Sequence, residues 1–372
     1  MNDLYIGLMS GTSLDGVDGV LVDLTPRATQ ALSVLAHEHR PLAPGLAAEL
    51  LALNTPGDNE LHRAALAGNA LTHVYAEVVH ALLAAAELPA DRVLAIGAHG
   101  QTVRHRPGEF DGTGYTMQLG NPALLAELTG IDVVADLRSR DVAAGGQGAP
   151  LVPAFHRAVF GRKGEAVSVL NIGGMANLTA LHADASTSGF DCGPGNALMD
   201  LWCRENTGQA FDEGGAWAAS GTVVEPLLAA MLGEPFFGLP PPKSTGRDLF
   251  HRAWLNRHLQ AHGVLHPQDV QATLTELTAR SCALAVLQSA GATTELLVCG
   301  GGVLNHHLMT RLRALLPTKS VVPTDTRGLP AMQVEASAFA WLARAFCRHE
   351  CANLSAVTGA AGPRRLGALY PA

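Results

Sequence analysis

The sequence predicts a two-domain α/β protein, and three observations lead to that expectation. The chain has 372 residues, which corresponds to about two domains at roughly 100–200 residues each. A unit of strand, glycine-containing turn and strand is predicted over residues 4–24 and again over residues 166–181. Apolar strand patterns and helical patterns then follow each other through both halves, as is typical of α/β folds.

The first half combines short buried strands with one long helix. Leu71, Val74, Val78 and Leu82 recur at helical spacing within residues 59–86, and Asp58 or Asn59 suits the N-cap. Short apolar runs predict strands at 4–9, 17–24, 92–96 and 131–135. The last two strands lead into polar loops, and α/β proteins usually bind ligands at such strand ends.

The second half is predicted to be mostly helical after residue 195. Strands are expected at 166–172, 176–181, 295–299 and 319–322. Helices are expected near 196–206, 221–233, 247–262, 267–290, 304–316 and 331–348. We assign residues 1–135 and 350–372 to the first domain and residues 136–349 to the second.

Composition excludes several classes of protein. Hydrophobic residues make up 48% of the chain and the mean hydropathy is +0.17, which excludes a disordered chain. The net charge of −8 provides no basic field for nucleic acid. No export signal and no apolar run of about 18 residues is visible, so we expect a cytoplasmic protein with no membrane partner. The six cysteines are dispersed and expected to be reduced.

The segment from Gly11 to Asp18 is the first candidate for chemistry. Its glycines free backbone N–H groups and its two hydroxyls add donors, which together suit phosphate oxygens. Asp15 or Asp18 could hold a water molecule of a magnesium ion. An ordinary hairpin loop explains the same residues equally well, because short glycine motifs occur often by chance.

Two further glycine segments also admit two interpretations. Asp191 precedes Gly193 and Gly195 at a predicted helix start, so it is either a catalytic base beside a phosphoryl group or the N-cap of that helix. Gly300, Gly301 and Gly302 follow a buried strand. They allow either the close approach of a flat ligand or tight packing of strand against helix.

Three polar segments complete the candidates. Residues 241–248 carry Lys243, one of only three lysines, and suit an anion-facing loop or a solvated surface loop. Residues 98–104 and 136–141 each follow a predicted strand and suit a polar small-molecule pocket. None of the three lysines follows a glycine, which excludes a P-loop, and no serine stands three residues before a lysine. Cys347 and Cys351 alone are weak grounds for a zinc site.

Six ordered segments, which span nearly the whole chain, resemble the anhydro-N-acetylmuramic acid kinase family. The resemblance is carried by Met9–Asp18, Gly97–Thr102, Asp141–Pro153, Asn171–Asn177, Phe190–Asn196 and Pro241–Arg247. It implies the two-domain fold of sugar kinases, Hsp70 and actin, which is ribonuclease H-like, with the active site in a cleft between the domains. It also implies ATP and Mg²⁺ as cofactors and a homodimer.

The resemblance implies a role for each candidate residue. Asp191 looks like the catalytic base. Contacts to ATP and its phosphates are implied for Gly11, Thr12, Ser13, Leu14, Asp15, Gly16, Val17, Asp18, Gly173, Gly174, Asn177, Gly193, Gly195, Gly300, Gly301 and Gly302. Contacts to the sugar are implied for His99, Gln101, Arg138, Asp141 and Glu335. A surface position on a helix is the alternative for Glu335.

The implied reaction is the ATP-dependent opening of 1,6-anhydro-N-acetylmuramic acid, with water added at C1 and phosphate placed on O6, in cell-wall recycling. The ether oxygen O6 carries no proton, so the base must act on the attacking water. Two alternatives stay open. One is a sugar or carboxylate kinase of the same fold acting on a free hydroxyl, and the other is an actin- or Hsp70-like nucleotide switch.

Overall fold

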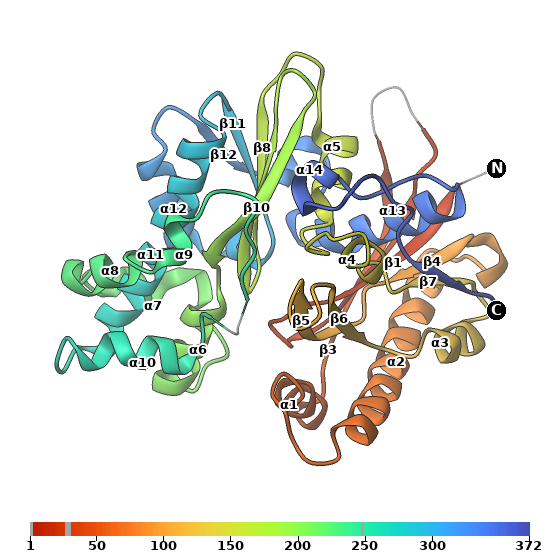
Figure 1. Ribbon diagram of the computed structural model, residues 1–372, viewed down its shortest axis with the longest axis horizontal. Coiled ribbons are helices and arrows are strands. Elements are labelled where there is room, and N and C mark those ends of the chain that lie inside the picture. The colour runs from red at the N-terminus through yellow and green to blue at the C-terminus, as the bar shows by residue number, and fades with distance from the viewer. Residues whose placement is uncertain (1–2, 27–30, 247–248) are drawn as a thin grey trace. The chain divides into compact units, whose positions relative to one another are not determined.

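The structure, a computed structural model, describes residues 3–26, 31–246 and 249–372. Arg247, in the last of the six segments, and the expected helix start at 247 lie outside the described residues. The chain divides into two compact units, Met1–Val159 with Gln333–Ala372, and Phe160–Met332. Each unit is built around one mixed β-sheet (Figure 1).

The sheet of the first unit has the strand order β13-β7-β4-β1-β2-β3. β1 pairs antiparallel with β2 and parallel with β4, so the sheet is mixed. The strands are β1 (Leu4–Ser10), β2 (Gly16–Asp23), β3 (Ser33–Pro41), β4 (Ala95–Ala98), β7 (Val133–Ala135) and β13 (Ala368–Tyr370), with a separate hairpin of β5 (Gln101–Pro107) and β6 (Gly114–Leu119). The helices are α1 (Pro44–Ala52), α2 (Glu60–Ala85), α3 (Pro122–Thr129), α4 (Ser139–Val142), α5 (Val152–Phe160), α13 (Val334–Cys347) and α14 (Ser355–Thr358).

Two helices cover opposite faces of this sheet because side chains alternate along β1. Ile6 and Leu8 belong to the core that includes Val78 and Leu82 of α2. Gly7 faces the other way, and a Cβ there would clash with the backbone of α13 at Ala336. Gly97 of β4, which pairs with Gly7, meets α13 in the same manner. The two glycines therefore let α13 lie directly on the strands.

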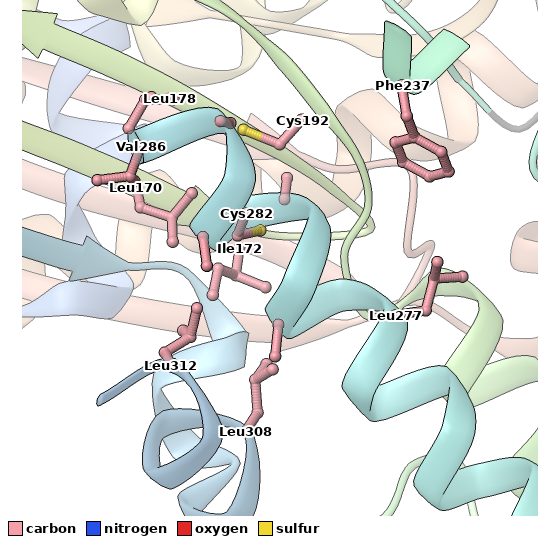
Figure 2. Packing of buried hydrophobic residues seen from close by; sticks show 14 of the residues in the cluster. Leu170, Ile172, Leu178, Cys192, Phe237, Leu277, Cys282, Val286, Leu308 and Leu312 are labelled. Atoms are coloured by element: carbon pink, nitrogen blue, oxygen red, sulfur yellow. The ribbon is translucent and has the colours of Figure 1, made fainter. Parts of the chain in front are cut away.

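The sheet of the second unit has the order β10-β9-β8-β11-β12. Its strands are β8 (Val167–Ile172), β9 (Met175–Leu181), β10 (Thr187–Pro194), β11 (Glu295–Cys299) and β12 (Ser320–Pro323). Its helices are α6 (Ala197–Thr207), α7 (Ala216–Ser220), α8 (Glu225–Leu232), α9 (Pro235–Gly238), α10 (Arg252–Gln260), α11 (Pro267–Ser289) and α12 (His306–Leu315). Leu170, Ile172 and Leu178 of the sheet pack with Val286 of α11 and Leu312 of α12 (Figure 2).

Both sheets share one topology. In each, three strands run as an antiparallel meander, and the first of them continues through two parallel strands to the other side. β13 is an addition at the edge of the first sheet. The duplicated strand–turn–strand unit that the sequence predicts is therefore confirmed, and the arrangement agrees with the ribonuclease H-like fold that the resemblance implies.

Most expected elements are present, with shifted ends. The helix expected from residue 221 begins at Glu225, and the one expected over 331–348 is α13 after a 3-10 turn. Asn59 is the N-cap residue of α2, one of the two expected positions, but it has a left-handed conformation and its side chain makes no cap hydrogen bond. The sequence analysis missed the strands β3, β10 and β13, the β5–β6 hairpin, and the helices α1, α3, α4, α5, α7, α9 and α14.

The division of the chain differs from the expected boundaries after residues 135 and 349. Residues 136–159 and 333–349 lie in the first unit. α13 packs on β1 and β4 through the two glycines, and Asp141 of α4 accepts hydrogen bonds from Asn353 and Thr358 near the C-terminus. These contacts explain why both segments belong to the first unit.

No single helix in the described residues is long and apolar enough to cross a membrane, although one pair bent by 119°, Glu213–Ser220 with Glu225–Leu232, passes on length and composition alone. All six cysteines are free.

Candidate active site

The loop from Gly11 to Asp15 joins β1 to β2 in the first unit. Leu14 takes a left-handed backbone with φ of 60°, and its N–H donates to the Gly11 carbonyl at 3.2 Å. Thr12 and Asp15 are exposed, while the Ser13 hydroxyl donates to Asp15 Oδ1 at 2.8 Å. This part of the loop is open to a ligand, as a phosphate cradle requires.

The rest of that candidate segment is strand β2. The Val17 side chain is buried in the core, so only its backbone is available to a ligand. Asp18 Oδ1 lies 3.0 Å from His39 Nδ1 and 3.4 Å from His37 Nε2 on β3. Burial raises the pKa of Asp18, but the hydrogen bonds to the two histidines outweigh it and hold that pKa below the usual value.

His99 links the polar segments at the strand ends of the first unit. Its Nδ1 lies 3.3 Å from the Ser10 carbonyl, and Arg138 donates to its Nε2 from Nε at 3.1 Å and from Nη2 at 2.9 Å. Burial, aided by the Arg138 charge, lowers the pKa of His99 to about 3. The ring is therefore neutral at physiological pH, with the proton on Nδ1 and Nε2 as the acceptor.

Gln101 and Tyr75 hold the end of β1 from the same side. Gln101 Nε2 donates to the Gly11 carbonyl at 3.1 Å, and Ser10 Oγ lies 2.8 Å from the Tyr75 hydroxyl. Within the described part of the chain, the buried Gln101 Oε1 has no hydrogen-bond partner. The side chains of His99, Gln101 and Tyr75 thus fix the start of the glycine loop, which favours a rigid binding element.

A cavity of about 340 Å³ opens beside His99 within the first unit. Tyr75, Thr116, Asn121, Asp136 and Tyr370 contribute to its polar lining. Asp136 follows β7 with a φ of 52°, a conformation that is uncommon outside glycine and often marks a functional position. The sequence-based expectation of a polar pocket at these strand ends agrees with this cavity.

The environment of Asp141 differs from the one expected of a residue that contacts the sugar. It is fully buried. Oδ2 accepts from the Gly148 N–H at 2.8 Å, and Oδ1 accepts from Asn353 at 2.7 Å and Thr358 at 2.8 Å. Both oxygens are satisfied inside the unit, so the geometry favours a role in holding the Gly145–Gly148 turn. Glu335 is half-buried in the first turn of α13.

In the second unit, a row of polar side chains crosses the sheet. Asn171 of β8 pairs with Asn177 of β9, which pairs with Asp191 of β10. Residues directly opposite in antiparallel strands share a face, and Leu170, Ile172 and Leu178 occupy the other face with α11. Asn177 Oδ1 is buried without a partner among the described residues. The row therefore places a carboxylate beside an unused acceptor.

Asp191 stands at an irregular point of an edge strand. The register between β9 and β10 shifts between Asp191 and Gly193, which makes Cys192 the extra residue of a β-bulge. Gly193 has a φ of 134°, and a Cβ there would lie 2.6 Å from the Phe237 ring. Helix α6 begins at Ala197 with Asn196 as N-cap, so the alternative in which Asp191 caps this helix is wrong.

The segment that carries Lys243 binds Asp191 directly. The Asp191 N–H donates to the Lys243 carbonyl at 3.1 Å, and the Thr245 N–H donates to Asp191 Oδ2 at 2.9 Å. The Lys243 ammonium donates to the carbonyls of Phe236 and Phe237 at 3.1 and 3.2 Å. The ammonium is therefore bound to backbone carbonyls in this structure, and the anion-facing loop stays a prediction.

Most of the other candidate glycines of the second unit lie in tightly packed places. The carbonyls of Gly173 and Gly174 accept from the N–H groups of Asn196, Gly195 and Ala197. A Cβ at Gly195 would clash with the Gly173 carbonyl, and one at Gly302 would clash with Ile172. A Cβ at Gly300 would lie 2.5 Å from Asn171 Oδ1, whereas one at Gly301 would find only Asn196 Nδ2 at 3.5 Å. Packing thus explains Gly300 and Gly302, and Gly301 is the position most open to a ligand.

Comparison with known proteins identifies the family. The family model described as anhydro-N-acetylmuramic acid kinase matches residues 3–372. The chain is 61% identical to the anhydro-N-acetylmuramic acid kinase of Variovorax paradoxus, covering 100% of this chain and 99% of the relative, and 59% identical to that of Albidiferax ferrireducens, covering 100% of both. This chain belongs to the anhydro-N-acetylmuramic acid kinase family. A solved activator of 2-hydroxyisocaproyl-CoA dehydratase from Clostridium difficile covers 95% of the chain and 99% of its own at 12% identity, with a TM-score of 0.45.

The sequence analysis of this kinase-family chain named the segment with Lys243 and Thr245 as a candidate, but it did not link this segment to Asp191. Thr245 and Lys243 lie more than 50 positions away, so no local pattern links them to the carboxylate. The row of Asn171, Asn177 and Asp191 could have been predicted from the sequence. Side chains alternate along a strand, so each of these polar residues faces away from the apolar residues next to it.

Proposed function

We propose that this chain is an ATP-dependent kinase that opens 1,6-anhydro-N-acetylmuramic acid and places phosphate on O6, giving N-acetylmuramic acid 6-phosphate in cell-wall recycling. The observation that carries the proposal is the family match over residues 3–372, together with full-length relatives of that name at 56–61% identity. ATP and the anhydro sugar are the substrates of that reaction.

Asp191 is the proposed base. Cleavage of the C1–O6 bond needs a nucleophile at C1, and the ether oxygen has no proton to give up. The carboxylate takes a proton from the attacking water as the new C1–O bond forms and the C1–O6 bond breaks. The freed O6 then forms a bond to the γ-phosphorus of ATP, and ADP departs as the leaving group. The Thr245 N–H fixes Asp191 Oδ2, and the unused Asn177 Oδ1 on the next strand offers an acceptor for a bound water.

In the first unit, the Gly11–Asp15 loop is the proposed phosphate-binding element, and its exposed Thr12 hydroxyl and N–H groups would face phosphate oxygens. His99, Arg138 and the adjoining cavity are proposed to bind the sugar. His99 is neutral and accepts two hydrogen bonds from Arg138, so the two side chains beside the cavity hold each other in a fixed orientation. The cleft between the domains that the family implies stays a prediction, as do the homodimer and the cytoplasmic location.

Magnesium fits this chain as an ion held mainly through phosphates and water. No group of three or more His, Cys, Asp or Glu side chains among the described residues is placed to hold a metal, and Mg²⁺ usually needs only one or two carboxylates besides phosphate. Asp15 is exposed, whereas Asp18 Oδ1 is occupied by His37 and His39, so Asp15 is the better of the two candidates. The ion would neutralise charge on the transferred phosphoryl group.

The test is a product assay with ATP, Mg²⁺ and 1,6-anhydro-N-acetylmuramic acid in ¹⁸O-labelled water. We expect product labelled at C1 and phosphorylated on O6, and a folded but nearly inactive Asp191→Asn. The matched control is Asp184→Asn, which changes an exposed carboxylate in the turn of the same hairpin. An active protein that phosphorylates only free sugar hydroxyls would refute the ring-opening reaction. Full activity of Asp191→Asn would move the base elsewhere.

A further inference from the structure

The Lys243 side chain is bound to backbone carbonyls of its own unit. Its ammonium is turned into the second unit, where it donates to two carbonyls of the short helix α9, those of Phe236 and Phe237. It also lies 4.7 Å from the centre of the Phe236 ring and 5.7 Å from that of Phe190. Burial lowers the pKa of Lys243. Hydrogen bonds and ring contacts thus occupy the group that a phosphate would otherwise attract.

The backbone around Lys243 lies along β10, an edge strand of its sheet. An edge strand has N–H and C=O groups that no neighbouring strand satisfies. At Asp191 the Lys243 carbonyl accepts the strand N–H, and two residues later the Thr245 N–H donates to the carboxylate. The loop therefore holds both the backbone and the side chain of the proposed base.

The anchor of this loop also contacts the bulge beside the base. Phe237, whose carbonyl accepts from Lys243, packs its ring against Gly193, where even a Cβ would be too close. Gly193 lies two residues after Asp191 and completes the shift in register. Asp191, the Lys243 loop, α9 and Gly193 thus form a closed ring of contacts, in which the Lys243 side chain is the link between loop and helix.

We propose that Lys243 is a positioning residue for Asp191. The Lys243 side chain holds the Lys243–Thr245 segment on β10, so that the Thr245 N–H orients the Asp191 carboxylate, and the lysine ammonium does not bind phosphate. The inference rests on the proposed function of Asp191 as the base. The Phe236 carbonyl also accepts from the Leu239 N–H, so loss of the ammonium would take the lysine donor from both carbonyls, leave that of Phe237 unsatisfied and free the loop to move. A displacement of about 1 Å can reduce the rate about 100-fold.

The experiment compares Lys243→Met and Lys243→Arg with the parent protein. Methionine keeps the length and apolar stem but has no donor, whereas arginine can donate to both carbonyls. We expect kcat of Lys243→Met to fall about 10- to 100-fold, with KM for ATP and for the sugar nearly unchanged, and Lys243→Arg to recover part of the loss. A phosphate-binding lysine would instead raise KM for ATP.

Lys319 provides a matched control. Its ammonium also donates to two backbone carbonyls of the second unit, Gly291 at 2.9 Å and Thr293 at 2.7 Å, but it contacts neither Asp191 nor its loop. Lys319→Met removes the same chemistry at a different place. We expect thermal unfolding of this variant at a lower temperature and an unchanged kcat, which separates positioning from general stability.

Amide hydrogen exchange gives a readout that does not depend on activity. The N–H groups of Asp191 and Thr245 both donate between loop and strand, so we expect peptides that contain them to exchange about 10-fold faster in Lys243→Met and to remain protected in Lys319→Met. If Lys243→Met fails to fold, the same measurement on Lys243→Arg and Lys243→Gln decides. Unchanged exchange, or a raised KM for ATP at constant kcat, would overturn the proposal. An inactive parent protein would refute the proposed function alone, because the exchange result needs no substrate.

Discussion

The buried neutral His99 predicts a specific dependence of stability on pH. The pKa of this histidine is about 3 in the folded protein and about 6.5 in an unfolded chain. Below pH 6.5 the unfolded chain therefore binds a proton that the folded protein does not, so stability falls as the pH drops from 6.5 towards 3. The contribution is complete above pH 6.5.

Substitution of His99 by glutamine removes the titration while keeping an acceptor for Arg138. At pH 7.5 we expect the variant to be less stable by about 1 kcal/mol, the usual value of a hydrogen bond. Between pH 7.5 and 5.5 the parent protein loses about 1.4 kcal/mol through this one site, because each pH unit below 6.5 costs about 1.36 kcal/mol. The difference between the two proteins should therefore vanish or change sign at pH 5.5.

Urea denaturation followed by circular dichroism at the two pH values measures this difference. The same substitution at His62, which is exposed on α2, controls for the change of residue type. A difference between parent and His99→Gln that stays constant from pH 7.5 to 5.5 would show that His99 is not held neutral, and the reasoning about Arg138 and Ser10 would fall with it.

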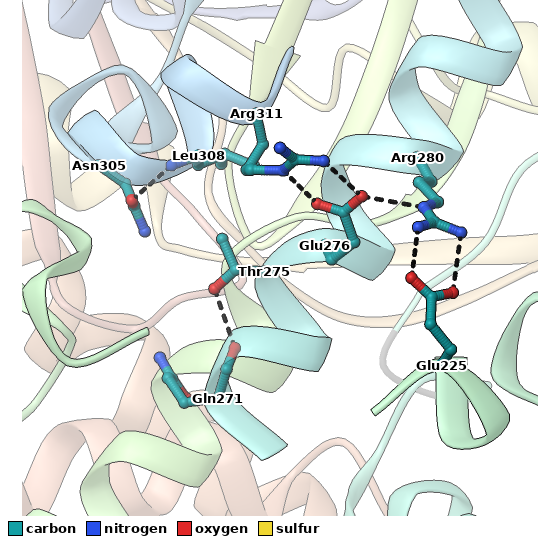
Figure 3. A network of polar contacts seen from close by, with 8 residues as sticks. All are labelled: Glu225, Gln271, Thr275, Glu276, Arg280, Asn305, Leu308 and Arg311. Carbon is teal, nitrogen blue, oxygen red and sulfur yellow. Dashed lines mark hydrogen bonds and ion pairs between the residues drawn. The ribbon is translucent and has the colours of Figure 1, made fainter. Parts of the chain in front are cut away.

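Three further predictions follow from packing and charge. Burial raises the pKa of Glu276, but its hydrogen bonds to Arg311 and Arg280 outweigh burial and hold that pKa below the usual value (Figure 3). Glu276→Gln should therefore lower the unfolding free energy at pH 7 by about 2 kcal/mol. That loss should disappear as the pH falls below about 4, while calorimetry of exposed Glu225→Gln should show less than about 1 kcal/mol. Gly97→Ala should lower the unfolding free energy by about 1–3 kcal/mol and should lower kcat, because a Cβ there would push away α13, which carries Glu335. Gly45 has open space around it, so Gly45→Ala should not lower the unfolding free energy. Asp141→Asn should cost about 1–3 kcal/mol in thermal unfolding, because an amide N–H₂ would face the Gly148 N–H, with KM for the sugar unchanged if the carboxylate only supports its turn.

The sequence predicts the frame of this fold because the strands of both sheets are short, apolar and next to glycine turns. β1, β2, β8, β9 and β11 all begin within two residues of the expected position. β3 escaped because it is an edge strand with His37, Glu38 and His39 on its surface, which reads as a polar loop. β13 escaped because it has three residues and forms only by pairing with β7, a contact that no local pattern encodes.

The candidate site was predictable in its chemistry but not in its supports. Asp191 and the Gly11–Asp15 loop follow from residue type and local spacing. Asp141 was expected at the sugar because it lies in a motif of the family, yet its three donors come from Gly148, Asn353 and Thr358, two of them more than 200 positions away. A separation of more than 50 positions likewise hid the contacts of Lys243 and Thr245 with Asp191. Interactions that depend on tertiary packing leave little local trace.

The shared topology of the two sheets helps to explain why the proposed base, Asp191, lies on the third strand of its meander. In the first sheet the turn between the first two strands is long and polar, and His37 and His39 of the third strand contact Asp18 of the second. In the second sheet the corresponding turn is only Gly173 and Gly174, and its carbonyls are used by the start of α6. The second unit thus has no long loop there to carry a carboxylate, and its third strand is free at one edge. A bulge at that edge re-aims Asp191, and the loop of Lys243 supplies the partners that a sixth strand would otherwise have given.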